Sequence, residues 1–244
     1  METNNNKERI AKVIAQRCGL SRRQAEQAIL DGRVMVNHEL LITPAHTVAP
    51  TDVIMLDHEL LKPMNKPFVI LYHKPVDYVC SHKAQKGQKT IYTAIKAHDP
   101  PDTFLRHVGR LDIASEGLVV LTNCPQTAHS LQHQNWKKQY KVRLQCILTP
   151  QHIKKLESIK RIDGYPITPM KVELIRQTST NCWAQFTLWE GRNRQIRKAL
   201  ESISSRASRI IRTHYGPFSL EGIPTNKYRQ LPFKDFQGYL AEIK

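Results

Sequence analysis

A proline-rich break near residue 65 divides the sequence into two parts that cannot share one continuous helix or sheet ladder. The break reads Lys62-Pro63-Met64-Asn65-Lys66-Pro67 and separates two regions of periodic apolar residues. Because proline lacks the backbone N–H and keeps its preceding residue out of the helical region, both prolines interrupt regular structure. We therefore expect a domain of residues 1–62, a linker of residues 63–67 and a larger domain of residues 68–244.

The positive charge of the chain belongs to the second part alone. Residues 1–62 hold eight Lys and Arg against eight Asp and Glu, and residues 63–244 hold 29 against 13, so the net charge of +16 arises after the break. A polyanionic partner would offset such an imbalance, which makes nucleic acid the leading partner class. With 40% hydrophobic and 24% charged residues, the composition favours a folded globular protein over a disordered or collagen-like one.

The cysteines and histidines predict no disulfide scaffold and no metal site. The five cysteines, at positions 18, 80, 124, 146 and 182, form no Cys-x-x-Cys pair. His129 and His133 lie four residues apart on an expected helix, but no Glu completes a metal motif. The first nine residues are polar and no apolar run approaches ~18 residues, so we expect neither a signal peptide nor a membrane span, and a cytoplasmic location.

Helical spacing predicts two short helices in the first part. Apolar residues at positions 10, 13 and 14 predict the first helix, which Gly19 ends. Ser21 and Gln24 form a capping-box pattern that begins the second helix, and Gly32 ends it. Strands are expected at residues 34–36 and 53–56, each followed by a turn pair and Glu-Leu-Leu.

The helical stretch of the first part has a basic face. Residues 7–36 carry seven basic and three acidic residues, and Arg22 and Arg23 fall in the first turn of the second helix, where the helix dipole disfavours cations. A phosphate bound at the free N–H groups of that turn would reverse the sign of this effect. A solvated basic face is the alternative; we favour RNA contact. The expected RNA-binding residues of this part are Arg9, Lys12, Arg22, Arg23 and Arg33.

Strand-like and helix-like segments alternate in the second part. Residues 68–72 predict an apolar strand, residues 139–146 alternate with Tyr140 on the buried face, and two further strands pair across a polar turn at residues 178–181. Helices are expected after Thr149-Pro150 and around Ile196. A last helix is expected to begin at Pro232 and to bury Phe233, Phe236, Leu240 and Ile243. Strands linked as hairpins favour an α+β fold with a mixed, mainly antiparallel sheet and packed helices.

Asp112 is the candidate reactive group. It lies in a loop between Gly109 and Gly117, directly before an expected buried strand, in a domain with few acids. The positive surroundings favour its ionised form, and Arg110 or another arginine could hold it ready as a nucleophile. The alternative is a loop aspartate that only accepts backbone hydrogen bonds, which is the default for a single Asp.

Residues 190–198 place four cations at one junction between a loop and a helix. With Ile196 turned inward, Arg197 lies beside the buried stripe, whereas Arg194 and Lys198 share another face. One cation could reach the interior while the others bind phosphates; a solvated basic helix is the alternative. Arginines with aromatic neighbours follow over residues 206–218, a composition suited to phosphate binding and base stacking.

Several strings in the chain resemble two known families. In the first part they are Arg9-Ile10, Gly19-Leu20-Ser21-Arg22-Arg23-Gln24-Ala25 and Gly32-Arg33-Val34-Met35-Val36-Asn37, which resemble the S-four-type RNA-binding domain. In the second part they are Lys74-Pro75 with Val79-Cys80-Ser81, Val108-Gly109-Arg110-Leu111-Asp112 with Ser115-Glu116-Gly117-Leu118 and Thr122-Asn123, Lys138-Gln139-Tyr140-Lys141-Val142, Gly191-Arg192-Asn193-Arg194-Gln195-Ile196-Arg197, and Ser208-Arg209-Ile210-Ile211-Arg212 to Gly216-Pro217. In this order they resemble the pseudouridine synthases of the RsuA/RluB/RluE/RluF group.

The resemblance implies an enzyme that isomerises a uridine in ribosomal RNA without a cofactor or metal. It implies that Asp112 is the catalytic aspartate, that Tyr140 packs against the target base and helps to move its proton, and that Arg197 is the basic partner of the aspartate. Arg110 and Arg192 would position RNA or brace the loop. Further RNA-binding cations are expected at Arg194, Lys198, Arg209 and Arg212.

The expected partner is ribosomal RNA, as a hairpin or within a ribosome assembly intermediate. We expect large-subunit rather than small-subunit RNA, and a monomeric protein. A non-catalytic RNA-binding assembly factor with the same fold and charge is the first alternative. The second is a DNA-binding regulator that uses residues 22–33 as a recognition helix. The support for this alternative is weak, because it consists of one short basic helix in a neutral domain.

Overall fold

The computed structural model describes residues 7–62, 66–83, 85, 87–101 and 103–240. Contacts between Cα atoms divide the chain into two compact units. The first unit comprises residues 1–67, 101–105 and 123–125, and the second comprises residues 68–100, 106–122 and 126–244. Residues 63–65 of the expected linker lie outside the described residues.

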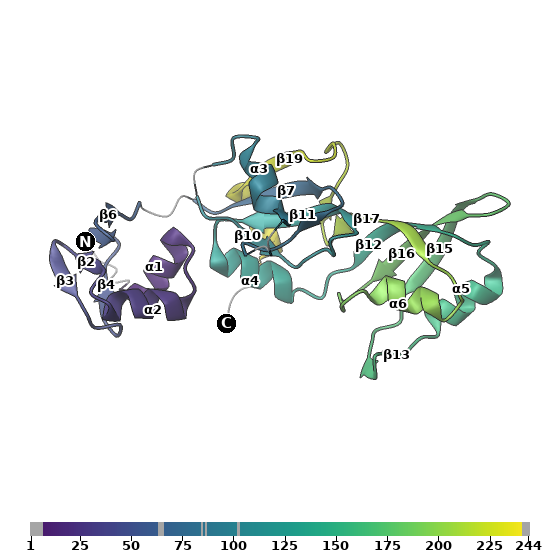
Figure 1. Ribbon diagram of the computed structural model, residues 1–244, viewed down its shortest axis with the longest axis horizontal. Coiled ribbons are helices and arrows are strands. Elements are labelled where there is room, and N and C mark those ends of the chain that lie inside the picture. The colour runs from purple at the N-terminus through teal and green to yellow at the C-terminus, as the bar shows by residue number, and fades with distance from the viewer. Residues whose placement is uncertain (1–6, 63–65, 84, 86, 102, 241–244) are drawn as a thin grey trace. The chain divides into compact units, whose positions relative to one another are not determined.

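Two helices and two β-hairpins build the first unit (Figure 1). Its four-stranded sheet has the order β3-β2-β5-β6, and β1 pairs with β4. The apolar sides of both helices pack on this sheet in one core, which includes Ile10, Ile14, Ile29 and Ile54. The elements are β1 (Glu8–Arg9), α1 (Ile10–Cys18), α2 (Arg22–Leu30), β2 (Val34–Val36), β3 (Glu39–Leu41), β4 (Thr47–Val48), β5 (Ile54–Leu56) and β6 (Glu59–Leu60).

The predicted ends of both helices are confirmed. Helix α1 ends at Gly19, whose φ of 78° lies in the left-handed region that glycine adopts without strain. At α2 the Ser21 hydroxyl accepts from the Gln24 N–H at 3.2 Å, and the Gln24 side chain accepts from the Ser21 N–H at 2.9 Å. This reciprocal pair satisfies two amide groups that a helix start leaves without partners.

The second unit is built around a mixed sheet of nine strands. Its main path has the order β15-β16-β12-β17-β11-β7-β19, with β10 paired to β11 and β18 paired to β17. Its elements are β7 (Phe68–Lys74), β8 (Tyr78–Val79), β9 (Lys89–Thr90), α3 (Ile91–Lys96), β10 (Arg106–Val108), β11 (Glu116–Thr122), α4 (Pro125–His133), β12 (Lys138–Leu144), α5 (Pro150–Glu157), β13 (Arg161–Ile162), β14 (Tyr165–Pro166), β15 (Lys171–Gln177), β16 (Cys182–Leu188), α6 (Gln195–Glu201), β17 (Ala207–Tyr215), β18 (Phe218–Ser219), β19 (Tyr228–Pro232), η1 (Phe233–Asp235) and η2 (Gln237–Tyr239).

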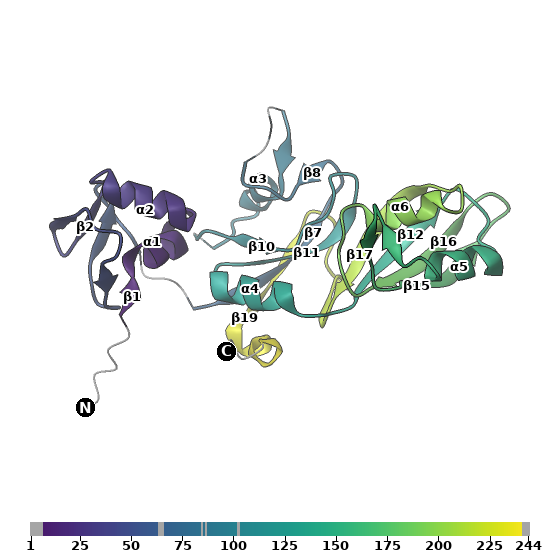
Figure 2. The ribbon, with the colours of Figure 1, turned by 90° about the horizontal axis from the view of Figure 1, so that it is seen from below.

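The predicted α+β fold with a mainly antiparallel sheet is confirmed. Within the nine-stranded sheet the parallel pair is β11 with β17, and the other pairs are antiparallel. Helix α4 packs beside β10 and β11, and α5 and α6 lie against the part of the sheet that holds β15 and β16 (Figures 1 and 2). Leu131 of α4, Val120 of β11 and Tyr215 of β17 belong to one buried core.

The central strands β11, β17 and β12 bring the segments that carry candidate site residues together. Strand β11 is buried along its whole length, and β12 alternates as predicted, with Tyr140, Val142 and Leu144 buried. Gly117 of β11 pairs with Arg212 of β17, and Tyr140 of β12 pairs with the same arginine from the other side. The residues that follow the turn at Asp112 are therefore held next to β17, whose other neighbour is β12.

The prediction of a final helix from Pro232 is wrong. Strand β19 continues to Pro232, which pairs with Phe68, and two 3-10 turns follow it. Phe236 has a φ of −134° that interrupts helical geometry, and its side chain is fully buried. Burying this ring against the core thus overrides the helical spacing, while Phe233 stays 38% exposed and Ile243 lies outside the described residues.

Candidate active site

A small cavity of about 130 Å³ brings Asp112, Tyr140 and Arg197 together. Asp112 comes from the loop before β11, Tyr140 from the middle of β12, and Arg197 from α6. These elements meet because β11, β17 and β12 are neighbours in the sheet. The cavity is also lined by the 109–112 loop, the 191–197 junction and Arg212. The candidate site therefore combines one carboxylate with a phenol and several guanidinium groups.

The loop that carries Asp112 is tied to the end of β7 by a buried lysine. Lys74 is fully buried, and its ammonium donates to the carbonyl oxygens of Pro75 at 2.9 Å and Ser115 at 2.6 Å, and more weakly to that of Ile113 at 3.4 Å. The Asp77 N–H adds a bond to the Ile113 carbonyl at 2.8 Å. These bonds fix the backbone on the C-terminal side of Asp112.

Burial lowers the pKa of Lys74 to about 8. Four nearby groups that can carry negative charge act in the other direction and raise this pKa: Cys80, Asp112, Asp77 and Glu116. The charged form is retained near neutral pH because three carbonyl groups replace part of its hydration. No role was predicted for Lys74, which belongs to the string Lys74-Pro75 of the family resemblance. The signal that could have revealed it is a lysine at the end of an apolar strand, directly before proline.

Arg197 braces the same loop from the other side. Its Nη2 donates to the Ala114 carbonyl at 2.8 Å and its Nη1 to the Ala207 carbonyl at 3.2 Å. Burial and the nearby charge of Arg194 lower the pKa of Arg197, while Asp112 opposes that shift. Among the described residues, no salt bridge joins Asp112 to Arg197, so the arginine acts on the carboxylate as a nearby charge. The buried Nε of Arg197 has no hydrogen-bond partner in the described part of the chain.

A second arginine lies beneath the cavity. Arg212 is 2% exposed, its Nε donates to the Leu118 carbonyl at 2.7 Å, and its guanidinium lies 5.3 Å from the ring centre of Tyr215. Its buried Nη2 has no hydrogen-bond partner among the residues described. Arg212, expected as one of several RNA-binding cations, is thus an interior residue of the pocket wall rather than a surface cation.

Arg209 is engaged by a buried carboxylate. Its Nε lies 2.8 Å and its Nη2 2.7 Å from one oxygen of Glu116, whose side chain is 9% exposed. The two residues stand 93 positions apart in the sequence, so this ion pair joins the beginning of β11 to β17. Its position at the entrance to β11 makes it a structural support for the loop of Asp112.

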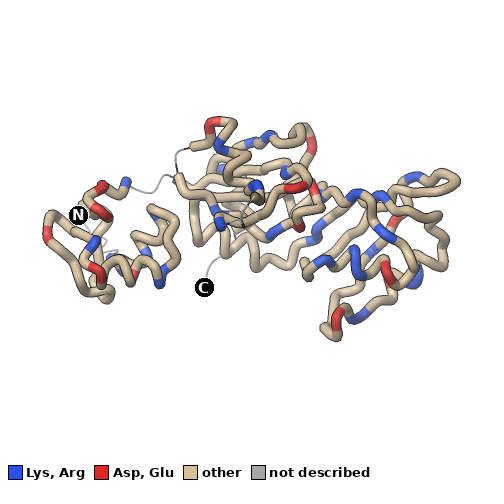
Figure 3. Tube along the Cα trace, in the orientation of Figure 1, with Lys and Arg blue, Asp and Glu red and all other residues tan. Residues whose placement is uncertain are grey.

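The other expected RNA-binding residues fall into two groups. Arg110 and Arg194 are exposed at the cavity, and Arg9, Arg22 and Arg23 are exposed on the first unit. The second group consists of cations that already have a carboxylate partner: Lys12 with Glu8 at 2.5 Å, Arg33 with Asp57 at 2.5 Å, Arg192 with Glu190 at 3.4 Å, and Lys198 with Asp163. Figure 3 shows Lys and Arg spread over the second unit with few Asp and Glu among them.

A larger cavity of about 680 Å³ adjoins the first one and shares Arg110, Asp112 and Arg192 with it. His107 lines this cavity, and its Nδ1 lies 2.6 Å from the hydroxyl of Tyr92. Burial, with the nearby His82 and Arg110, lowers the pKa of His107 to about 4. The imidazole is therefore neutral at physiological pH and contributes hydrogen bonding rather than charge.

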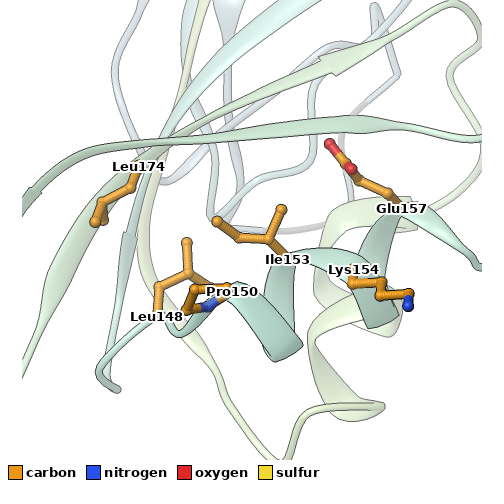
Figure 4. A pocket seen from close by; sticks show the side chains of 6 residues that line it. All are labelled: Leu148, Pro150, Ile153, Lys154, Glu157 and Leu174. Carbon is orange, nitrogen blue, oxygen red and sulfur yellow. The ribbon is translucent and has the colours of Figure 1, made fainter.

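A third cavity has different chemistry and lies elsewhere. It measures about 400 Å³ and is formed between α5 and β15. Figure 4 shows Leu148, Pro150, Ile153 and Leu174 around it, with the ammonium of Lys154 pointing away from these apolar side chains. It shares no lining residue with the two polar cavities and contains no part of the candidate active site.

The described residues contain neither a metal-binding cluster nor a membrane-spanning helix. Within residues 7–62, 66–83, 85, 87–101 and 103–240, no group of three or more His, Cys, Asp or Glu could hold a metal ion. Over the same ranges, the helices are too short or too polar for any of them to cross a bilayer.

Comparison with known families matches both units. The model of the RNA pseudouridylate synthase family matches residues 68–202, and that of the S4 domain matches residues 8–54. The first match contains the 109–112 loop, Tyr140 and Arg197. The second covers both helices of the first unit and most of its strands.

Individual relatives resemble the chain over nearly its whole length. An uncharacterised RNA pseudouridine synthase of Rickettsia bellii is 34% identical over 93% of this chain and 98% of its own, and one of Rickettsia conorii is 32% identical over 91% and 96%. A solved crystal structure of a pseudouridylate synthase is 26% identical, covers 95% of this chain and 99% of its own, and superposes with a TM-score of 0.61.

The fold and the cavity thus define an RNA-modifying enzyme with an S4 domain at its N-terminal end. The chain belongs to the RNA pseudouridylate synthase family, and it is an isomerase that converts uridine in RNA to pseudouridine.

Proposed function

We propose that the protein isomerises one uridine of ribosomal RNA, in the manner of the RsuA/RluB/RluE/RluF group, and that its substrate is large-subunit rather than small-subunit RNA. The observation that carries the proposal is the cavity that combines Asp112, Tyr140 and Arg197 in a strongly basic domain. In this proposal residues 1–62 bind RNA, and residues 68–244 hold the reacting nucleotide.

The reaction rearranges bonds within one nucleotide. The bond from C1′ of ribose to N1 of uracil breaks, the uracil turns within the pocket, and a new bond forms between C1′ and C5. The hydrogen leaves C5 and N1 gains a proton, so atoms and electrons balance without a further reactant. The protein must supply an ionised carboxylate, a way to move the C5 proton, and a pocket that retains the detached base.

We assign these tasks to the three residues of the cavity. Asp112 attacks the nucleotide or assists removal of its proton. Tyr140 is 8% exposed, lies on the rigid centre of β12, packs against the uracil and helps to move the C5 proton. Arg197 is the basic partner of the aspartate and holds the following backbone in place. The reacting uridine must leave its helix to reach them, which costs a few kcal/mol that stacking and phosphate contacts offset.

The basic helix of the first unit supports an RNA-binding role for Arg22 and Arg23. Both are exposed in the first turn of α2, with no acidic residue in that turn. Removing them should leave α2 folded, because cations at a helix N-terminus interact unfavourably with its dipole. A loss of RNA affinity in the double variant would therefore report lost contacts rather than unfolding.

We expect Arg22→Ala with Arg23→Ala to weaken binding to a large-subunit rRNA transcript and to flatten its salt dependence. Each lost phosphate contact should reduce the slope of log affinity against log salt by about 0.7–0.9. The measurement is filter binding over a series of salt concentrations. Lys154→Ala with Lys155→Ala, on α5, makes the same change in net charge and serves as the control. An unchanged slope in the Arg22/Arg23 variant would contradict the assignment.

The substrate is tested with transcripts of both ribosomal RNAs that carry 5-tritiated uridine. Formation of the C5–C1′ bond releases the C5 hydrogen, so we expect tritium in water from the large-subunit transcript and far less from the small-subunit one. Mapping pseudouridines in rRNA from cells that lack the protein should show one missing site. Release from the small-subunit transcript alone would move the assignment to that subunit, and binding without release would favour an assembly factor.

A further inference from the structure

A short hairpin between α5 and β15 lies outside all the strings that define the family resemblance. It consists of β13 and β14, which pair Ile162 with Tyr165 across a turn made by Asp163 and Gly164. Both turn residues have positive φ, 52° and 78°, which is the geometry of a tight two-residue turn. Figure 1 shows β13 projecting beyond α6.

The hairpin is fastened to the rim of the active-site cavity. Nη2 of Arg192 donates to the Pro166 carbonyl at 3.1 Å, and the Thr168 N–H donates to Glu190 at 2.8 Å. Lys198 of α6 forms an ion pair with Asp163 at the turn. Arg192 itself lines both polar cavities. These contacts fix the position of the hairpin relative to the cavity that contains Asp112.

One aromatic ring on the hairpin is open to solvent. Tyr165 is 63% exposed, the largest fraction among the exposed large hydrophobic side chains of the described residues. The guanidinium of Arg192 lies 5.8 Å from its ring centre and covers one side of the ring. Because the ring packs into no core, it gains little stabilisation from burial of apolar surface. The face that Arg192 leaves uncovered is free to stack on another ring.

The charges around the ring suit a polyanion. Arg161 on β13 and Lys160 directly before that strand are exposed. Arg192 stands beside Tyr165 and pairs with Glu190 at 3.4 Å. Asp163 is the one acidic residue of the segment 160–167, and Lys198 already neutralises it. Among the described residues, Lys160 and Arg161 have no carboxylate partner. An exposed aromatic ring in a segment that carries such cations is the combination that binds single-stranded nucleic acid by stacking and phosphate contact.

We propose that Tyr165 is a stacking platform for an unpaired base of the substrate RNA near the reacting uridine, with Lys160 and Arg161 contacting the adjacent phosphates. This inference rests on the proposed function for the identity of the RNA. The platform acts on substrate binding and takes no part in the bond rearrangement. It would hold the RNA beside the cavity while the target base is turned out of its helix.

The first test measures binding in the absence of turnover. Asp112→Asn protein and its Tyr165→Ala derivative are titrated against the large-subunit rRNA transcript by filter binding. Loss of one stacked base should raise Kd about tenfold, the equivalent of 1.4 kcal/mol. Tyr165→Phe should keep the affinity, since the ring is preserved, whereas Tyr165→Leu should lose it. Ile175→Ala, at a 46% exposed position on β15, is the matched surface control and should have no effect.

The second test separates binding from chemistry in the active enzyme. We expect Tyr165→Ala to raise KM for tritium release by about tenfold while kcat changes less than about twofold, because the ring lies outside the cavity that holds Asp112. Equal Kd and KM for Tyr165→Ala and the parent would overturn the platform and leave the proposed function intact. Absence of release by the parent enzyme would overturn the proposed function, while the Kd comparison would still decide the platform.

Discussion

Replacing Asp112 by asparagine should abolish isomerisation while RNA binding is retained. The amide has nearly the shape of the carboxylate but can neither attack carbon nor accept a proton as a carboxylate does. Among the described residues no hydrogen bond to the Asp112 side chain is present, so the exchange leaves the loop held by Lys74 and Arg197. We expect tritium release to fall at least about 10³-fold, the scale seen when a nucleophile or its base is removed.

The measurement is single-turnover tritium release with enzyme in excess, next to filter binding of the same transcript. Asp77→Asn is a suitable control, because Asp77 lies near the same loop but its side chain does not line either polar cavity. Undiminished release by Asp112→Asn would refute the assignment of this carboxylate. A matching loss of binding would mean that the side chain serves RNA contact.

Gly117→Ala should prevent the second unit from folding correctly. A Cβ at this position would lie 2.4 Å from the backbone oxygen and 2.6 Å from the backbone nitrogen of Arg212, because β11 and β17 approach closely where these residues pair. The φ of 110° is also unfavourable for a residue with a side chain. Backbone atoms within a sheet cannot move aside cheaply, so we expect a loss on the order of 3–5 kcal/mol in the free energy of unfolding.

Urea unfolding followed by circular dichroism measures this loss, with soluble expression as a first indicator. Gly238→Ala is the matched control, since a Cβ there meets nothing within 4 Å and its φ is not in the left-handed range. We expect the control to unfold with the parent midpoint. A Gly117→Ala protein with the parent midpoint would show that β11 and β17 can separate without cost.

Local patterns allowed much of the fold to be predicted. The end of α1 at Gly19, the capping box at Ser21 and the burial alternation around Tyr140 depend on neighbours within a few residues. Such features are fixed by φ preference, by helix-end hydrogen bonds and by the period of two in strands. The same kind of reasoning predicted the burial of Phe236 correctly but failed for the helix around it, because the chain buries this ring from two 3-10 turns.

The supports of the candidate site could not be predicted from local patterns. Arg212 binds the carbonyl of Leu118, 94 positions away, and Arg209 pairs with Glu116 across 93 positions. A sequence shows that an arginine is present but not whether it meets solvent or a carbonyl group inside the sheet. For Lys74, its place at the end of an apolar strand is visible in the sequence, but its bond to the Ser115 carbonyl, 41 positions away, is not. The grouping of Asp112, Tyr140 and Arg197 was expected through family resemblance alone.

The parallel pairing of β11 with β17 sets the order in which a nascent chain can acquire the candidate active-site cavity. The first unit can gather its core once about a quarter of the chain has been synthesised, because nearly all of it lies before residue 67. The cavity needs residues up to Arg212, so polypeptides that stop before β17 lack the strand on which the loop of Asp112 rests. Premature termination would therefore release fragments that retain an RNA-binding domain but have no isomerase activity.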